Sequence, residues 1–232
     1  MANTQLTFYG HAAFKVLTPT GNVLLIDPWL TNPTFDKGNE ELAALKRVDL
    51  ILLTHGHGDH VGDTVDIAHR TGATAICNYE ISGWLGKQKV KAHGMQHGGG
   101  HKFPFGYCKL TLAFHGSQLP DGSEGGNPCG FLIKFNDGKM LYNAADTGLF
   151  GDMKLIGEEG IDLACLPIGD NFTMGPDDAL RAVKLLTPKK VMPMHYDTFP
   201  LIAQDANAWA ARVKSQTQAT PVVLTPGDWI DL

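Results

Sequence analysis

The chain has 232 residues, of which 43% are hydrophobic and 19% charged, and its formal net charge is −5. This balance predicts one globular α/β domain over residues 1–232, and it disfavours nucleic-acid binding, which would need a basic surface. No apolar run reaches the ~18 residues of a membrane span, and residues 1–10 lack the segments of a secretion signal. We therefore expect a cytoplasmic protein without a membrane segment.

The cysteines agree with a reducing compartment. They are scattered along the chain and form no Cys-x-x-Cys pair, lying at Cys77, Cys108, Cys129 and Cys165. In a chain of this size we expect them to be buried thiols rather than disulfide partners.

The first quarter of the chain predicts short strands. Leu6 and Phe8 alternate with polar residues, and residues 14–17 and 23–26 form short apolar runs. Both patterns are typical of β-strands. A short helix is expected at residues 40–47, and a buried strand at residues 48–53.

Helices and strands follow one another through the rest of the chain. Val61, Val65 and Ala68 recur at helical spacing and predict one helix that starts directly after residue 60. Two later helices begin near Pro176 and Ala206, and further strands are expected at residues 74–77, 108–114, 131–135, 140–143, 163–166 and 191–194. The glycine-rich segments 93–105 and 120–128 are expected to be loops. Two sheets packed face to face, with helices outside, satisfy this order.

The loop after residue 54 carries metal-binding chemistry. His55, His57, Asp59 and His60 lie within six residues, between the buried strand and the helix. Imidazole and carboxylate ligands suit Zn²⁺, and also Mn²⁺, Fe or Ni²⁺. One ion cannot easily take all four ligands from so short a loop. We therefore expect the first two histidines to serve one ion, and the other two residues to serve a second ion close by.

This pattern resembles the His-x-His-x-Asp-His signature of the metallo-β-lactamase superfamily. The resemblance implies a four-layer αββα sandwich, with two mixed β-sheets and helices outside. It also implies a further histidine, a bridging aspartate and a last histidine, which the chain offers in that order at His115, Asp146 and His195. By this resemblance, one ion is held by His55, His57 and His115, the other by Asp59, His60 and His195, and Asp146 bridges them.

Three other stretches narrow the resemblance to the UPF0173 group of metal-dependent hydrolases. They are residues 10–14, residues 25–30 and residues 167–175, with the sequences GHAAF, LIDPWL and PIGDNFTMG. The group is similar to ascorbate-6-phosphate lactonase and, more distantly, to phosphodiesterase-type members. Its substrates are largely unassigned, so the resemblance informs the fold and mechanism more than the substrate.

Further candidates for contact with substrate or with the ligands are His11, Asp27, His97, Asp170 and Asn171. The resemblance places His11 beside the metals, in a binding or a structural role. Asp27 is expected to accept a hydrogen bond from a ligand histidine, with turn capping as the alternative. His97 flanks a glycine run and is a candidate for lining the cleft. Asp170 and Asn171 have the same two alternatives as Asp27, a contact with the site or a structural role in a turn.

Together these residues predict a binuclear metal-dependent hydrolase. A hydroxide that bridges two divalent metal ions would attack a small ester, lactone, phosphoester or amide. Zinc is the metal that we expect at both sites. Asp59 is expected to orient or relay the proton. We expect a small-molecule substrate and no nucleic-acid or membrane partner. A homo-oligomer is compatible with the sequence, since closed homo-oligomers are common among such proteins.

Other activities on the same fold remain as alternatives. A diiron redox enzyme would carry a carboxylate at the position of His57, so the imidazole favours hydrolysis. An RNA-processing nuclease would need a basic surface or an added RNA-binding arm. A thioester hydrolase of the glyoxalase II kind would need a helical C-terminal domain, and only 37 residues follow His195. The intact ligand set disfavours a catalytically silent module.

Overall fold

The computed structural model describes residues 3–232, so Met1 and Ala2 of the predicted domain lie outside it. Two seven-stranded sheets form the centre of the structure. The first has the order β14 (Trp229–Asp231), β1 (Gln5–Phe8), β2 (Phe14–Leu17), β3 (Val23–Ile26), β4 (Leu50–Leu52), β5 (Thr74–Asn78), β6 (Ala92–Met95). The second has the order β13 (Thr220–Pro221), β12 (Lys190–Met194), β11 (Leu163–Pro167), β10 (Met140–Asn143), β9 (Cys129–Phe135), β8 (Gly106–Leu112), β7 (Gly100–Phe103).

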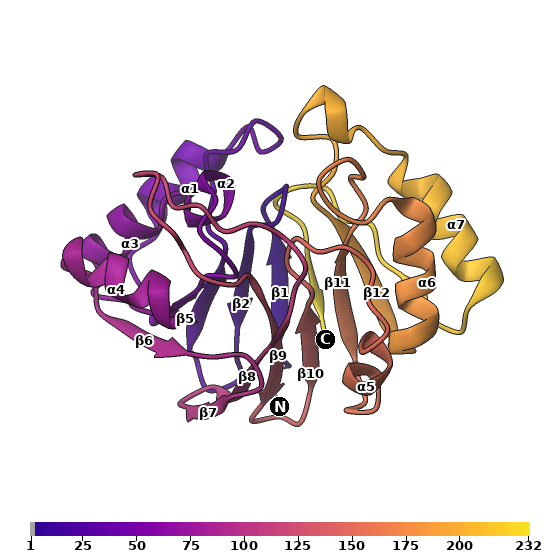
Figure 1. The fold of residues 1–232 in the computed structure, drawn as a ribbon, viewed down its shortest axis with the longest axis horizontal. Coiled ribbons are helices and arrows are strands. Elements are labelled where there is room, and N and C mark those ends of the chain that lie inside the picture. The colour runs from indigo at the N-terminus through magenta and orange to yellow at the C-terminus, as the bar shows by residue number, and fades with distance from the viewer. Residues whose placement is uncertain (1–2) are drawn as a thin grey trace.

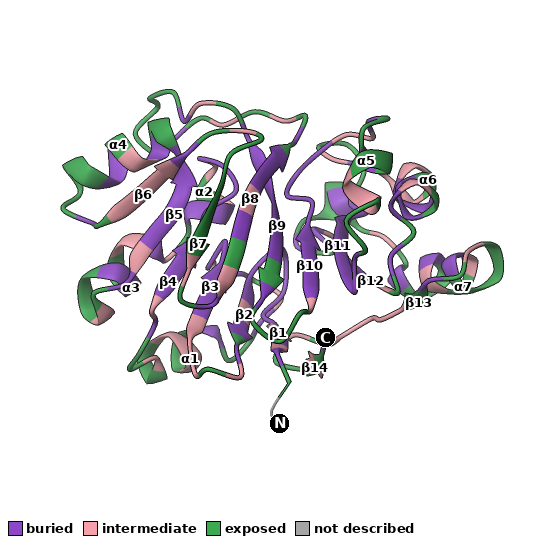
Figure 2. Cartoon of the chain, turned by 90° about the horizontal axis from the view of Figure 1, so that it is seen from below, coloured by how far each residue is buried: buried purple, intermediate pink, exposed green. Residues whose placement is uncertain are grey.

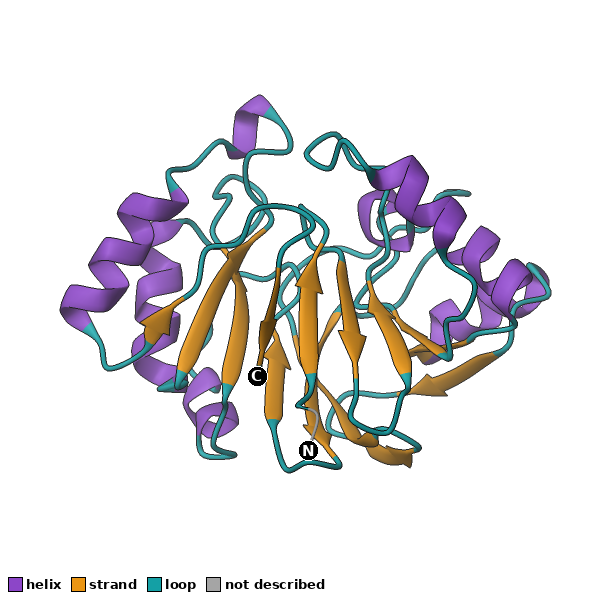
Figure 3. Cartoon of the chain, turned by 180° about the vertical axis from the view of Figure 1, so that it is seen from behind, coloured by secondary structure: helices purple, strands orange, loops and turns teal. Residues whose placement is uncertain are grey.

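Helices cover the outer face of each sheet (Figures 1 and 3). On the first sheet these are α1 (Gly38–Ala44), α2 (Gly58–Val61), α3 (Thr64–Thr71) and α4 (Tyr79–Lys87). On the second they are α5 (Met153–Gly157), α6 (Pro176–Leu186) and α7 (Ala206–Gln216). Both sheets mix parallel and antiparallel pairs. The predicted α/β fold with four αββα layers is therefore confirmed.

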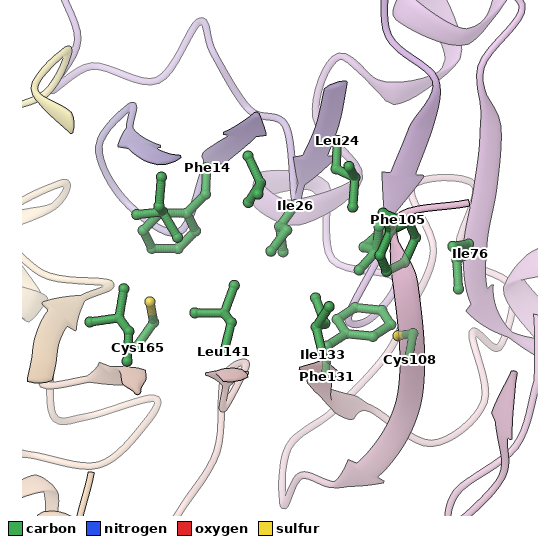
Figure 4. Close-up of a cluster of buried hydrophobic side chains, with 14 of the residues drawn as sticks. Phe14, Leu24, Ile26, Ile76, Phe105, Cys108, Phe131, Ile133, Leu141 and Cys165 are labelled. Atoms are coloured by element: carbon green, nitrogen blue, oxygen red, sulfur yellow. The ribbon is translucent and has the colours of Figure 1, made fainter. Parts of the chain in front are cut away.

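The core between the sheets explains the strand pattern. Phe14, Leu24 and Ile26 of the first sheet face Ile133 and Leu141 of the second (Figure 4). Strands such as β3 are buried on both sides, because helices cover their other face, and therefore consist of unbroken apolar runs. Figure 2 shows this burial along the central strands, with exposed residues on the outer sides of the helices. The four cysteines are unpaired and buried, as predicted.

Phe131 tests the contribution of this core to stability. The residue is fully buried in the cluster between the sheets, and Phe131→Ala should lower the free energy of unfolding by about 3–5 kcal/mol, because it leaves a cavity. Urea unfolding in the presence of a chelator measures the change without a contribution from metal. Leu155→Ala, at a side chain that is 60% exposed, is the control and should change little. Equal effects of the two substitutions would contradict this account.

Some predicted boundaries were wrong. Residues 93–105 are not a loop, since β6 and β7 lie there as the outermost strands of the two sheets. Edge strands bury few side chains and need little apolar pattern, which explains the error. The single helix expected after residue 60 is two helices, because the chain breaks at Gly62, where φ is +42° and an added Cβ would lie 2.7 Å from the Pro28 carbonyl oxygen. The sequence reading also missed α4 and α5.

Over residues 3–232, no helix combines the length and apolar character that crossing a bilayer requires.

Candidate metal centre

The predicted ligands follow the carboxyl ends of strands. In the first sheet, the parallel strands β3 and β4 lead to Asp27 and to the loop of His55. In the second, β8, β10 and β12 run in one direction and lead to His115, Asp146 and His195. Ligands of open α/β sheets bind outside such ends. The fold therefore brings residues far apart in the sequence to one edge of the sandwich.

Donor atoms within 4.8 Å of one another form three groups in residues 3–232. The groups are His55, His57 and His115; His11, Asp59, His60 and His195; and His55, His60 and Asp146. The first two contain the two ligand triplets that the sequence resemblance implied, with His11 added to the second. The third contains one histidine from each triplet together with Asp146, which therefore lies between them.

Asp146 lies at the centre of the cluster and is only 2% exposed. Its Oδ2 atom lies 2.8 Å from Nε2 of His195, 3.3 Å from His60, 3.5 Å from His115 and 3.9 Å from His55. Two ligand atoms on one tetrahedral zinc, with bonds of about 2.0–2.1 Å, lie roughly 3.3 Å apart. The spacing of these atoms is therefore close to that of atoms that share an ion.

Several buried donor atoms of this cluster lack a hydrogen-bond partner. They are His60 Nε2, Asp146 Oδ1, and both ring nitrogens of His195. His195 Nε2 lies close to Asp146, yet the angle between them is unsuitable for a hydrogen bond. Each unsatisfied buried polar atom costs about 1–3 kcal/mol. Divalent cations would satisfy these atoms, so the residues present fit a metal centre.

The residues behind the cluster set the tautomers of two histidines. The Thr54 hydroxyl donates its single hydrogen to Asp27 Oδ2 at 2.6 Å, because a carboxylate only accepts. It must then accept a hydrogen bond from His55 Nδ1, at 2.9 Å. Asp27 Oδ2 also accepts from His60 Nδ1, at 2.8 Å. The Nε2 atoms of both histidines are left to face the cluster, as metal ligation requires.

The charges of the cluster oppose the effect of burial. Burial alone would lower the pKa of His60 and raise that of Asp146, but their mutual attraction, with further contributions from Asp27 and His195, holds the first well above its usual value and the second well below. Burial lowers the pKa of His55, which has no carboxylate at hydrogen-bond distance. Without metal, a proton on His60 balances the two carboxylates that flank it.

His11 also contacts this cluster, at Asp59 and His195. Burial lowers its pKa to about 4, so the ring is neutral and carries one hydrogen. Since Asp59 can only accept, His11 Nε2 donates to Asp59 Oδ2 at 3.0 Å, and His11 Nδ1 accepts from the Thr198 hydroxyl at 2.7 Å. The His11 carbonyl oxygen also accepts from the backbone amide of His195, at 2.7 Å. His11 therefore orients two members of the cluster.

Backbone strain is concentrated at this edge of the sheets. His11, Asp27 and His195 have φ values of +52°, +44° and +55°, and Ala145, directly before Asp146, has +61°. Each non-glycine residue in this region costs on the order of 1–3 kcal/mol. This strain places side chains at the cluster that a relaxed strand end would direct elsewhere.

A cavity of about 490 Å³ opens over the cluster. Its walls include Leu119, Pro120, Phe172 and Phe199 as well as five of the predicted ligands. A larger cavity, about 730 Å³, lies between α1 and the C-terminal segment, and no group of metal donors found in the described residues lies there.

None of the five predicted contact residues lines this cavity: His11 and Asp27 bond the predicted ligands from outside it, and the other three lie farther away. Asp170 and Asn171 are exposed, and the Asp170 carboxylate accepts from the Asn171 amide within its own loop. Their neighbour Phe172 reaches the cavity instead. His97 bonds the Pro128 carbonyl oxygen at 2.7 Å and lines an adjoining cavity of about 460 Å³ that also contacts His115. The sequence reading missed Phe172 and Phe199, although the first lies within the 167–175 motif.

Asp27→Asn should weaken metal binding without removing a candidate ligand. The amide keeps the shape of the carboxylate but loses the charge that orients His60 and Thr54. Losing such a partner typically costs 10–100-fold in metal affinity. Competition with a chromophoric chelator measures the dissociation constant. Asp49→Asn is the control, because its carboxylate accepts from the Val23 amide at the far end of β3. An unchanged constant in Asp27→Asn would contradict the role of this residue.

The chain is similar to known sequences along its whole length. A family model described as "Beta-lactamase superfamily domain" matches residues 22–196. A UPF0173 metal-dependent hydrolase of Pelotomaculum thermopropionicum is 48% identical over 98% of this chain and 100% of its own length. Another, of Symbiobacterium thermophilum, is 50% identical over 97% of this chain and 98% of its own.

Solved structures agree with the fold. Igni18, a metallo hydrolase of Ignicoccus hospitalis, superposes with a TM-score of 0.91 at 39% identity, covering 100% of this chain and 99% of that one. CmlA, a diiron β-hydroxylase of Streptomyces venezuelae, reaches a TM-score of 0.75 at 15% identity, covering 100% of this chain and 55% of that one. The second likeness concerns the fold alone.

Proposed function

The chain belongs to the β-lactamase superfamily and, within it, to the UPF0173 metal-dependent hydrolases, and from this premise we propose that it hydrolyses a small molecule at a binuclear metal centre. The observation that carries the proposal is the position of Asp146. Its Oδ2 atom lies within 3.9 Å of four histidine nitrogens that belong to two separate donor groups.

Two sets of residues would hold the ions. His55, His57 and His115 form one set, and Asp59, His60 and His195 form the other, with Asp146 shared. All-imidazole and mixed imidazole–carboxylate sets suit zinc, with manganese, iron or nickel as alternatives. When bound, such a pair lowers the pKa of water towards about 7 and polarises the oxygen of the bond to be cleaved.

The residues of the chain supply orientation and charge. Asp59 lines the cavity; burial alone would raise its pKa, but the hydrogen bond from His11 and the nearby imidazoles of His195 and His60 hold the pKa well below the usual range. It therefore stays ionised and is suited to orient a water molecule by accepting its hydrogen. His57 and His115 face the cavity from the first set, so a substrate in the cavity contacts both sets. A small ester, lactone, phosphoester or amide fits this arrangement.

Metal analysis and a substrate panel test the proposal together. Protein loaded with zinc and then desalted should contain two equivalents by elemental analysis. It should hydrolyse at least one member of a panel of lactones, esters, amides and phosphodiesters, and a chelator should abolish that turnover. Protein with two ions but no turnover on the panel would argue against a hydrolase of small molecules. Protein that retains only one ion would argue against the binuclear centre.

A further inference from the structure

We propose that the part of the substrate beyond the reacting bond is uncharged and apolar, and that Phe172 and Phe199 bind it. The inference rests on the proposed hydrolase function and names its substrate class.

The cavity over the metal centre has a polar floor and an apolar rim. The predicted ligands form the floor, the buried Leu119 lies in the wall, and Pro120, Phe172 and Phe199 form most of the rim, to which Gln118 adds one polar side chain. Its volume of about 490 Å³ falls within the range of ~300–1,000 Å³ that is typical of small-molecule pockets. A substrate placed with its reacting bond at the floor must therefore extend along the rim.

The two phenylalanines are unusually exposed for their type. Phe172 is 51% exposed and Phe199 39% exposed, and they come from different loops, one before α6 and one before the short helix η1 (Pro200–Ile202). Single exposed apolar side chains are common, but two that line one cavity indicate a binding surface. Phe199 is also held in place, because it stacks on Trp29 with ring centroids 6.1 Å apart and meets the edge of His11 at 6.0 Å.

Among the described residues, the rim offers no cationic side chain to a charged tail. The chain has 19 lysines and arginines, yet none of them lines this cavity or the adjoining one beside His115 within the described residues. A phosphate or carboxylate on the tail, such as that of ascorbate 6-phosphate, would therefore be buried without a cation.

The adjoining cavity extends the apolar surface. It contains Leu112, Ala113, Phe114 and Pro128 beside the polar side chains of His97, His115 and Asn127, and Phe114 is 60% exposed. Among the described residues, no lysine, arginine, aspartate or glutamate lines this cavity, so an apolar tail longer than the first cavity can continue past His115 along Leu112 and Phe114.

Two matched substrate series test the inference with zinc-loaded protein. The lactones are γ-butyrolactone, γ-octalactone with its butyl tail, and 5-oxotetrahydrofuran-2-carboxylate with a carboxylate in place of the tail. The esters are methyl acetate, methyl pentanoate and monomethyl succinate. Burial of one methylene is worth about fourfold, and in an open cavity we expect about tenfold higher kcat/KM for the apolar tail. The carboxylate tail should lower kcat/KM below that of the unsubstituted compound.

Variants assign the preference to the two residues. In Phe172→Ala and Phe199→Ala, the ratio of kcat/KM between tailed and untailed substrate should fall by about threefold to tenfold. Leu155→Ala removes an exposed apolar side chain in α5 and should keep the wild-type ratio. An unchanged ratio in both phenylalanine variants, or a preference of the wild type for the carboxylate tail, would overturn the inference.

A binding measurement separates this inference from the hydrolase proposal. Ligand-observed NMR gives the dissociation constant of 3-phenylpropan-1-ol, a neutral compound that cannot be hydrolysed, for the zinc-loaded protein. We expect binding that weakens at least threefold in each phenylalanine variant. Such binding without hydrolysis of any panel member would refute the proposed function and keep the apolar site. Equal dissociation constants in wild type and variants would refute the site even if hydrolysis is found.

Discussion

Asp146→Asn is expected to abolish turnover and to reduce bound zinc from two equivalents to less than one. The carboxylate lies within 3.9 Å of four histidine nitrogens, and the imidazoles of His195 and His60 keep it ionised despite its burial. The amide keeps the shape but removes the negative charge that both ions would share, so both sites should weaken together. A loss of about 4 kcal/mol in transition-state stabilisation corresponds to roughly 10³-fold in rate. Elemental analysis and hydrolysis of the best panel substrate measure the two effects.

The control for this variant is another buried carboxylate. Asp162 is 8% exposed and pairs with Lys189 at 2.7 Å, on the second sheet but away from the cluster. Asp162→Asn should be less stable than the wild type, because the Lys189 ammonium and the Met140 backbone amide offset the burial of the charged carboxylate. The variant should nevertheless keep two zinc ions and wild-type turnover. If Asp146→Asn also kept both ions and its activity, Asp146 would not be the shared residue.

The fold could be predicted because its strands are buried on both faces. Residues 14–17, 23–26 and 140–143 form strands with the boundaries that the sequence indicated. Unbroken apolar runs bounded by turns are a strong signal when helices cover one face of a sheet and a second sheet covers the other. The edge strands β6 and β7 gave no such signal, since their stability comes from pairing with a neighbour.

The residues at the cluster were predicted from a local motif and, for His115, Asp146 and His195, from the family resemblance, but their geometry depends on backbone strain. The left-handed conformations of His11, Asp27 and His195 leave no signature in the sequence. Glycine usually marks such positions, and here histidine and aspartate occupy them. The surrounding hydrogen bonds, such as the one from the His195 backbone amide to the His11 carbonyl oxygen, offset the cost of this backbone strain.

The apolar rim was missed for a related reason. Phe199 looks like an ordinary loop residue in the sequence, and only the fold brings it against Trp29, which is 170 residues earlier in the chain. Sequence reasoning finds ligands by their chemistry, whereas substrate-binding apolar residues have no distinctive chemistry. Their recognition requires the cavity.

His57→Ala is expected to remove one ion and to leave the other. Its ring belongs to the group with His55 and His115, whereas Asp59, His60 and His195 stay intact. The fold should be preserved, because His57 is only partly buried and makes no side-chain capping bond to α2, although it is the N-cap residue. Zinc content should fall to about one equivalent, and turnover should fall by roughly 10³-fold, since the loss of one cation removes several kcal/mol of charge stabilisation.

His69→Ala is the matched control for this variant. His69 lies on α3, away from the cluster, and among the described residues its Nε2 atom bonds only the Gln88 carbonyl oxygen, at 2.9 Å. It should therefore keep two ions and full turnover, while circular dichroism of both variants matches the wild type. Wild-type turnover in His57→Ala with one ion bound would mean that a single site carries the chemistry. In that case the set with Asp59, His60 and His195 would be sufficient, and the role assigned to the first set would have to be withdrawn.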